Sequence, residues 1–324
     1  MLLKFDDNNY KIYYYKEEIA FLEIQYYNCV RFRNGVSLMQ VSIDWKEYSC
    51  LASGNGEKLE RWGNVVLRRP DPQIIWEQSG DDIWNKWDGF YHRSNKGGGS
   101  WEFKKKLPEH WTIKYKNLTF KVSPTNFKHT GIFPEQAVNW DYVMVKIKKA
   151  NRDDFRVLNL FAYTGCASMA ASSAGAAEVV HVDASKGMVE WAKENRDLCG
   201  LADNKIRFIV DDVIKFLERE KRRGRTYHGI IMDPPSYGRG PNGEVWRLED
   251  NLQELLLKSK EVLDDDYSFL LINSYTTGVS PTSLQNILKL TFEGSNVETG
   301  EIGLPIQEHN LVLPCGIYGR VTKD

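Results

Sequence analysis

The sequence RVLNLFAYTGC, residues 156–166, decides the fold. An apolar run of strand length leads into a turn at Gly165, and small residues follow it. Glycine lets the backbone of such a turn approach a ligand closely, because it has no Cβ. The stretch therefore predicts a strand, a ligand-binding turn and a tightly packed helix. Only one glycine of the G-x-G-x-x-G pattern for a dinucleotide pyrophosphate is present, which indicates a ligand without a diphosphate.

Further apolar runs of strand length follow at regular intervals along the chain. We expect strands at Arg156–Phe161, Glu178–Val182, Ile206–Val210, Gly229–Met232 and Ser268–Ile272. Their apolar residues are continuous rather than alternating, as in strands that are covered on both faces. Between them lie helical stretches, and Ser185–Cys199 has a serine cap before it and Gly200 after it. This alternation predicts an α/β fold, a Rossmann-like doubly wound sheet with ligands at the carboxyl ends of its strands.

The segment before this sheet has a different pattern. Short apolar runs alternate with Gly- and Pro-containing turns over residues 40–122, which is typical of a small β-rich α+β region. We expect an N-terminal extension at 1–38, a small β-rich domain at 39–122 and a ligand-binding domain at 123–324. Two interpretations stand for residues 1–38: an edge strand and helix, or a poorly ordered extension ahead of a natural start at Met39.

Composition excludes several classes of protein. The 324 residues include 43 Lys+Arg and 44 Asp+Glu, a net charge of -1, so any nucleic-acid surface must be a local patch. The five cysteines are scattered and form no CxxC pair, which indicates a reducing cytoplasm and neither a disulfide framework nor a metal site. We expect no membrane span and no secretory signal, because no apolar run is long enough.

Two further strand ends carry acids. Asp183, followed by Ala184, lies 18 residues after Gly165, close to the spacing at which an acid binds ribose hydroxyls in a strand–helix–strand unit. A carboxylate can accept both hydroxyl hydrogens. After the third strand, Asp212 is our candidate for accepting from an adenine amino group, with Asp211 as the alternative. A lone acid at a strand end is more often a helix cap, but three such signals in order favour a ligand site.

The fourth strand ends in Asp233-Pro234-Pro235-Ser236-Tyr237. Two prolines fix the backbone and remove two N–H donors, so carbonyl oxygens are left as acceptors. Asp233 adds a carboxylate, and the Tyr237 ring can stack on a planar base. The alternative is a merely rigid turn. We expect Asp233, Pro234 and Tyr237 to be catalytic, with Asn273 at the end of the next strand as a further polar contact.

These ordered motifs resemble those of class I S-adenosylmethionine-dependent methyltransferases. More narrowly, residues 40–324 resemble the bacterial 23S ribosomal RNA methyltransferases that include cytosine-C5 and guanine-N7 enzymes. Residues 127–136, FKHTGIFPEQ, are similar to the family's K-T-G-x-x-x-D-Q element, which closes over the methionine part of the cofactor. The resemblance implies S-adenosylmethionine as cofactor, and we expect no room in this sequence for the separate N-terminal RNA-binding module that some members of the family carry. It implies cofactor-binding roles for Lys128, Thr130, Gln136, Phe161, Ala162, Tyr163, Thr164, Gly165, Asp183, Ala184, Asp211, Asp212 and Asp233.

One departure from the family bears on the chemistry. Cytosine-C5 methylation requires a cysteine thiolate that adds to the base, and neither the 233–237 turn nor the segment Ile272-Asn273-Ser274-Tyr275 contains one. Cys166 lies in the cofactor loop, where a small packing residue is the simpler interpretation. N-methylation is therefore favoured.

The substrate is less well determined by the sequence. Basic runs occur at 104–106, 146–149 and 219–225, the first among Trp101, Phe103, Trp111 and Tyr115. They suit a phosphate backbone with unpaired bases, or else they are solvated faces, and the last is expected to end a helix. Three hypotheses stand: an RNA methyltransferase acting on ribosomal RNA, a small-molecule or protein methyltransferase, and a non-catalytic binding protein. The oligomeric state stays open.

Overall fold

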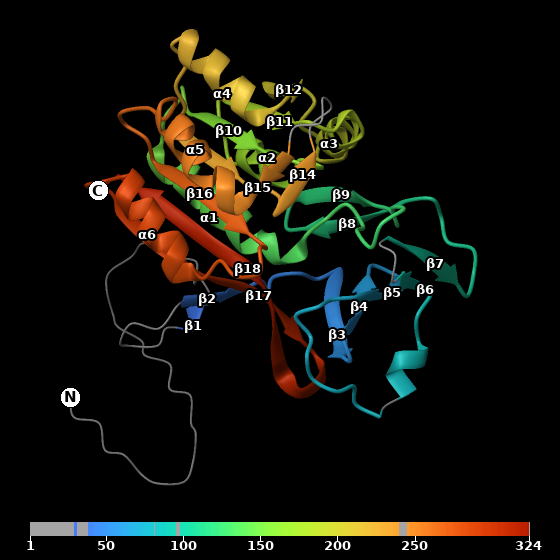
Figure 1. Ribbon diagram of the computed structural model, residues 1–324. Coiled ribbons are helices and arrows are strands. Elements are labelled where there is room, and N and C mark those ends of the chain that lie inside the picture. Colours follow the sequence, from blue (N-terminus) through green and yellow to red (C-terminus); the bar gives the residue numbers. More distant parts are fainter. Residues whose placement is uncertain (1–28, 31–37, 81, 95–97, 240–244, 324) are drawn as a thin grey trace, which may run out of the picture.

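A mostly parallel sheet forms the centre of the molecule in the computed structural model, which describes residues 29–30, 38–80, 82–94, 98–239 and 245–323 (Figure 1). Five parallel strands run in the order β12-β11-β10-β13-β16, followed by β18, which is antiparallel to both β16 and β17. Their bounds are β10 (Arg156–Leu160), β11 (Glu178–Asp183), β12 (Ile206–Val210), β13 (Gly229–Met232), β16 (Phe269–Ser274), β17 (Asn296–Ile306) and β18 (Leu311–Thr322). The predicted α/β fold class is confirmed.

Helices cover both faces of this sheet. Side chains alternate between the faces along each strand, and so Leu158 packs with residues of α4, α5 and α6, whereas its neighbour Val157 packs with residues of α1 and α2. Ser185 caps α3 as expected, since its hydroxyl accepts from Met188 N at 3.4 Å. The helices are α1 (Ala137–Ala150), α2 (Cys166–Ser173), α3 (Lys186–Leu198), α4 (Val213–Arg222), α5 (Leu248–Lys260) and α6 (Pro281–Thr291). The basic run 219–225 ends α4, as predicted.

The N-terminal part is rich in strands and continues the central sheet. Strand β17 pairs in parallel with β2 and, through Ile306 opposite Cys50, with β3; the sheet then continues through β4, β5, β6 and β7. The bounds are β1 (Cys29–Val30), β2 (Leu38–Val41), β3 (Tyr48–Gly54), β4 (Glu57–Trp62), β5 (Val65–Pro70), β6 (Gly89–Arg93), β7 (Gly99–Phe103), and a separate hairpin of β8 (Trp111–Tyr115) and β9 (Leu118–Val122). The domain boundaries at 38 and 122 stay predictions, and the one for 1–38 falls mostly outside the described residues.

Short 3-10 turns complete the chain: η1 (Asp82–Asn85), η2 (Pro134–Gln136) and η3 (Glu308–Asn310). Of the described helices, none is both long and apolar enough to cross a membrane. Turn η2 leads directly into α1 and, with the carboxyl ends of the parallel strands, surrounds the site described next.

Candidate active site

The loop after β10 has an unusual backbone. Phe161 (φ 53°), Tyr163 (φ 50°) and Gly165 (φ 82°) all adopt left-handed conformations, which are costly for the two aromatic residues. The loop is held by Ala162 N donating to Val182 O at 3.0 Å and by Tyr163 N donating to an Asp183 carboxylate oxygen at 2.8 Å. Strain that the surroundings maintain in this way is characteristic of ligand-binding loops.

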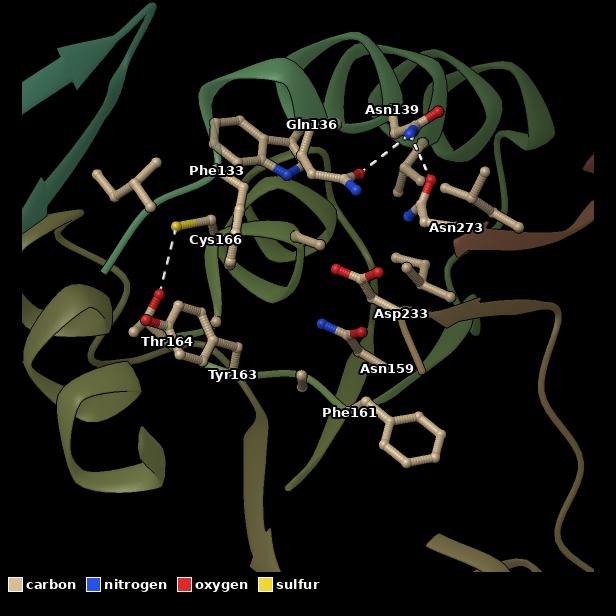
Figure 2. A pocket seen from close by; sticks show the side chains of 18 of the residues that line it. Phe133, Gln136, Asn139, Asn159, Phe161, Tyr163, Thr164, Cys166, Asp233 and Asn273 are labelled. Atoms are coloured by element: carbon tan, nitrogen blue, oxygen red, sulfur yellow. Dashed lines mark hydrogen bonds between the residues drawn. The ribbon is translucent and has the colours of Figure 1, made fainter. Parts of the chain in front are cut away.

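A cavity opens between this loop, turn η2, helix α1 and the ends of β13 and β16 (Figure 2). Its lining includes the predicted residues Gln136, Phe161, Ala162, Tyr163, Thr164, Gly165, Asp233 and Asn273. It also includes residues that were not predicted, among them Asn139, Asn159 and Trp140. The predicted cofactor loop, the start of the 233–237 turn (called the acceptor turn below) and Asn273 in strand β16 therefore meet at one cavity.

Asp183 ends β11 beside this loop and is not part of the cavity lining. Its carboxylate accepts from Tyr163 N and Ser185 N, each at 2.8 Å, one on each oxygen. Burial raises the pKa of Asp183. Each carboxylate oxygen keeps a lone pair for a further donor, so the arrangement is compatible with a ribose role for Asp183 and Ala184, which stays a prediction.

The acids after β12 have partners in the structure. Asp212 caps α4, accepting from Lys215 N at 2.9 Å, and Asp211 forms an ion pair with Arg219 and accepts from Asp212 N. The helix cap is thus the role that Asp212 fills here. Neither acid lines the cavity, and their adenine contact stays a prediction.

The segment 128–136 closes the cavity on the other side. Gly131 (φ 93°) is packed so tightly that an added Cβ would lie 2.4 Å from Trp191, and its carbonyl accepts from the Thr164 hydroxyl at 2.6 Å. Thr130 is fully buried, and its hydroxyl has no partner in the described part of the chain. Lys128 lies away from the cavity, with its ammonium 3.4 Å from Pro70 O. Of the three candidates in this element, Gln136 lines the cavity, together with its neighbours Gly131, Ile132 and Phe133.

A buried ion pair in the N-terminal sheet anchors this segment. Arg69 binds Glu60 through both Nε (2.7 Å) and a terminal nitrogen (2.9 Å), and its other terminal nitrogen donates to Lys128 O at 2.8 Å. Burial raises the pKa of Glu60, but Arg69 and Lys58 outweigh it and lower the pKa to about 2. The sequence analysis missed this pair, because residues of two neighbouring strands carry no signal for a loop 59 residues away.

Asp233 has a strongly perturbed carboxyl group. Burial, followed by the nearby charge of Glu135, raises its pKa from 3.8 to about 7. Burial also raises the pKa of Glu135, which is 5% exposed. Such a value suits a group that exchanges a proton near neutral pH. Glu135 was not predicted, although an acid beside Gln136 in the quoted element was a signal for it.

The side-chain amides of Gln136, Asn139 and Asn273 form one wall of the cavity, called the amide wall below. Asn139 Nδ2 donates to Gln136 Oε1 at 3.0 Å and to Asn273 Oδ1 at 2.8 Å, the two dashed bonds at the top of Figure 2. Gln136 Nε2 in turn donates to the Tyr275 hydroxyl at 2.7 Å. The polar groups on this side are therefore tied into one network rather than placed independently.

The acceptor turn, residues 233–237, leads from β13 into a short two-stranded hairpin. Tyr237 is 51% exposed and begins β14 (Tyr237–Arg239), which pairs with β15 (Val245–Arg247). The Trp246 indole donates to Pro235 O at 2.7 Å, and its ring lies 5.2 Å from that of Phe161. Pro234 is buried beneath the turn. The hairpin that follows the turn thus packs an aromatic ring against Phe161, which lines the cavity.

The residues present fit S-adenosylmethionine: a tight glycine-containing loop without a diphosphate site, beside a cavity lined by the side-chain amides of Gln136, Asn139, Asn159 and Asn273. A parallel sheet with such a cavity at its strand ends is the arrangement of doubly wound α/β proteins that bind nucleotide-like ligands. The family model described as S-adenosylmethionine-dependent methyltransferase matches residues 89–275. The chain belongs to this family, and S-adenosylmethionine is its cofactor.

Relatives and solved structures agree with this assignment. The crystal structure of the SAM-dependent methyltransferase from Agrobacterium tumefaciens is 37% identical, covers 90% of this chain and 95% of that chain, and has a TM-score of 0.85. A methyltransferase-fold protein from Streptococcus mutans, 19% identical over 86% of this chain and 76% of that chain with a TM-score of 0.65, shares the fold.

Two curated relatives are ribosomal RNA large subunit methyltransferases K/L. The one from Shewanella frigidimarina is 36% identical over 138 residues, 42% of this chain and 18% of the relative. The one from Syntrophotalea carbinolica is 27% identical over 230 residues, 71% of this chain and 30% of the relative. The chain thus matches less than a third of the length of either.

Proposed function

We propose that this methyltransferase methylates a nitrogen of an RNA base, with ribosomal RNA as the favoured substrate. The descriptions of the curated relatives support a ribosomal RNA substrate. The observation that carries the proposal is Asp233, a carboxyl group that lines the cavity with a pKa raised to about 7 and that is followed four residues later by the exposed ring of Tyr237.

Bound S-adenosylmethionine supplies a methyl group that its positive sulfur already activates. The protein's task is then to position the acceptor. Asp233 accepts a hydrogen bond from the amine of the base and takes up its proton. Pro234 and Pro235 stiffen the turn without competing N–H donors, and stacking on Tyr237 contributes about 1–3 kcal/mol per base.

The cysteines favour nitrogen over carbon as the acceptor. Cys166 lines the cavity, but burial raises the pKa of its thiol to about 12, so it stays protonated. Burial likewise raises the pKa of Cys315 well above its ordinary value. A C5 mechanism requires a thiolate, and neither of these thiols supplies one.

Exposed aromatic and basic side chains in the N-terminal sheet support an RNA contact. The Lys104 ammonium lies 4.1 Å from the centre of the Trp87 ring, and Phe103, 45% exposed, stacks on Trp101 at 5.8 Å. Of the other predicted aromatic residues, Tyr115 is buried and bonded to Asp141. The contact surface we propose is therefore limited to strand β7 and the residues beside it.

The test is mass-spectrometric mapping of modified nucleosides in ribosomal RNA from wild-type and deletion cells. We expect one N-methylated base to be lost on deletion and restored by the purified protein, but not by Asp233→Ala, whose affinity for S-adenosylhomocysteine should stay close to that of the wild type. Unchanged ribosomal RNA in the deletion cells would contradict the substrate. Full turnover by Asp233→Ala would remove Asp233 from the mechanism.

A further inference from the structure

A buried arginine lies directly behind the amide wall of the cavity. Arg320, in β18, is 3% exposed, and its guanidinium packs over the rings of Tyr142 (4.0 Å) and Tyr318 (4.3 Å). One terminal nitrogen donates both to Asn139 Oδ1 at 2.9 Å and to Gln40 Oε1 at 2.8 Å. Burying a charged guanidinium costs folding free energy. The burial of Arg320 therefore indicates a role beyond packing.

The arginine determines which way each neighbouring amide points. A guanidinium has donors and no acceptor, so Asn139 must turn its oxygen toward Arg320. Its nitrogen then faces the other way and can only meet oxygens, which are Gln136 Oε1 and Asn273 Oδ1 at 3.0 and 2.8 Å. With its oxygen engaged, Asn273 directs Nδ2 elsewhere.

Asn273 Nδ2 is therefore available to a ligand in the cavity, which Asn273 lines. On the opposite side, Asn159 Nδ2 donates to Ser168 Oγ at 2.9 Å, which leaves Asn159 Oδ1 as an acceptor. The described residues that line the cavity include no lysine, arginine or histidine. The cavity thus offers a neutral donor on one side and an acceptor on the other, a pattern that suits a zwitterion such as an amino acid.

We propose that Arg320 is a positioning residue for the cofactor: through Asn139 it holds the Asn273 amide so that Nδ2 donates to the carboxylate at the amino-acid end of S-adenosylmethionine. The inference depends on the cofactor and not on the identity of the methyl acceptor. The Arg320 proposal can therefore hold if RNA is not the substrate, and the RNA proposal can hold if Arg320 has no role in cofactor binding.

The variant Asn139→Asp tests this orientation without changing the shape of the side chain. An aspartate keeps its contact with Arg320 but has no donor, so Asn273 must turn its nitrogen toward residue 139 and its oxygen toward the cavity. We expect affinity for S-adenosylhomocysteine, measured by calorimetry, to fall about 10- to 100-fold, as for a buried charged group that loses its hydrogen bond. Affinity for 5′-methylthioadenosine, which lacks the amino-acid end, should change less than about twofold.

Two further variants complete the experiment. Arg320→Lys keeps the charge but loses the planar fork, and we expect the same selective loss for S-adenosylhomocysteine. Glu298→Gln is the matched control, because Glu298 lies 3.6 Å from the opposite terminal nitrogen of Arg320 and does not contact Asn139. It should leave both affinities unchanged. Equal losses for both ligands, or no loss in either Asn139→Asp or Arg320→Lys, would overturn the proposal.

Discussion

Replacing Asp233 by asparagine should stabilise the protein while it strongly slows methyl transfer. The folded state raises the pKa of Asp233 from 3.8 to about 7, and each pKa unit is worth about 1.4 kcal/mol. A shift of about three units gives an upper limit of about 4 kcal/mol for the cost of the ionised carboxylate above pH 7. Because the side chain borders the cavity and is partly solvated, we expect asparagine to raise the free energy of unfolding at pH 8 by about 1–2 kcal/mol, with Tm higher by about 2–4 °C per kcal/mol.

The pH dependence gives this prediction its sharpest form. The folded-state pKa of Asp233 lies above the unfolded value, so the folded protein binds the proton more tightly between about pH 4 and pH 7. The stabilising effect of that proton is fully present below about pH 4 and is lost as the pH rises through about 7. The Tm difference between Asp233→Asn and wild type should therefore be near zero at pH 4, grow up to about pH 7, and stay constant above it.

Differential scanning calorimetry at half-unit pH steps measures this curve, with Asp203→Asn as a control at an exposed acid. The control should give a difference that is small at every pH. A flat difference for Asp233→Asn, or an asparagine variant that is less stable at pH 8, would refute the reasoning about its burial. Turnover should fall at least about 100-fold, the usual range for loss of an acid–base group.

Three further predictions concern the walls of the site. Glu60→Gln should lower the free energy of unfolding by about 3–5 kcal/mol in urea titrations; because its cationic partners lower the pKa of Glu60 to about 2 despite its burial, this contribution is present above about pH 4.5 and is lost as the pH falls through 2. A Glu60→Gln variant as stable as the wild type would contradict this stabilising contribution of Glu60. Gly131→Ala places a Cβ 2.4 Å from Trp191 and should weaken S-adenosylhomocysteine binding at least about tenfold by calorimetry, whereas Gly175→Ala, also at positive φ but with open space around it, should bind normally; equal effects would count against the clash. Asp183→Asn should weaken the same binding about 10- to 100-fold if the carboxylate accepts from ribose, and an unchanged dissociation constant would remove it from the site.

The sequence was sufficient for the central sheet because each strand carries its own signal. Gly229–Met232 is apolar throughout and Ile206–Val210 is apolar except for Arg207, and the structure has strands with the same bounds. The loop at 161–165 and the acids at 183 and 233 could be placed for the same reason, since the ends of parallel strands share one edge of a sheet. Features that depend on a short stretch of sequence, such as these strands and the residues at their ends, could therefore be predicted from the sequence.

Long-range contacts account for what was missed. Arg320 and Asn139 are 181 positions apart and meet only because β18 inserts beside β16. Arg69 supports the 128–136 segment from a strand that reads as an ordinary part of a β-rich region. Glu135 looked like one acid among many until burial and the neighbouring Asp233 gave it a raised pKa.

Strand β17 links the N-terminal strands to the cofactor-binding half and limits bending between them. It bonds along its whole length to β18, and it also pairs with β2 and β3, so one ladder of backbone hydrogen bonds joins the N-terminal strands to the cofactor-binding half. Bending the molecule between these halves would break that ladder, whose bonds must stay paired where they are buried. If RNA binds at β7 as proposed, the separation between that surface and Asp233 would then set which base along the substrate reaches the cavity.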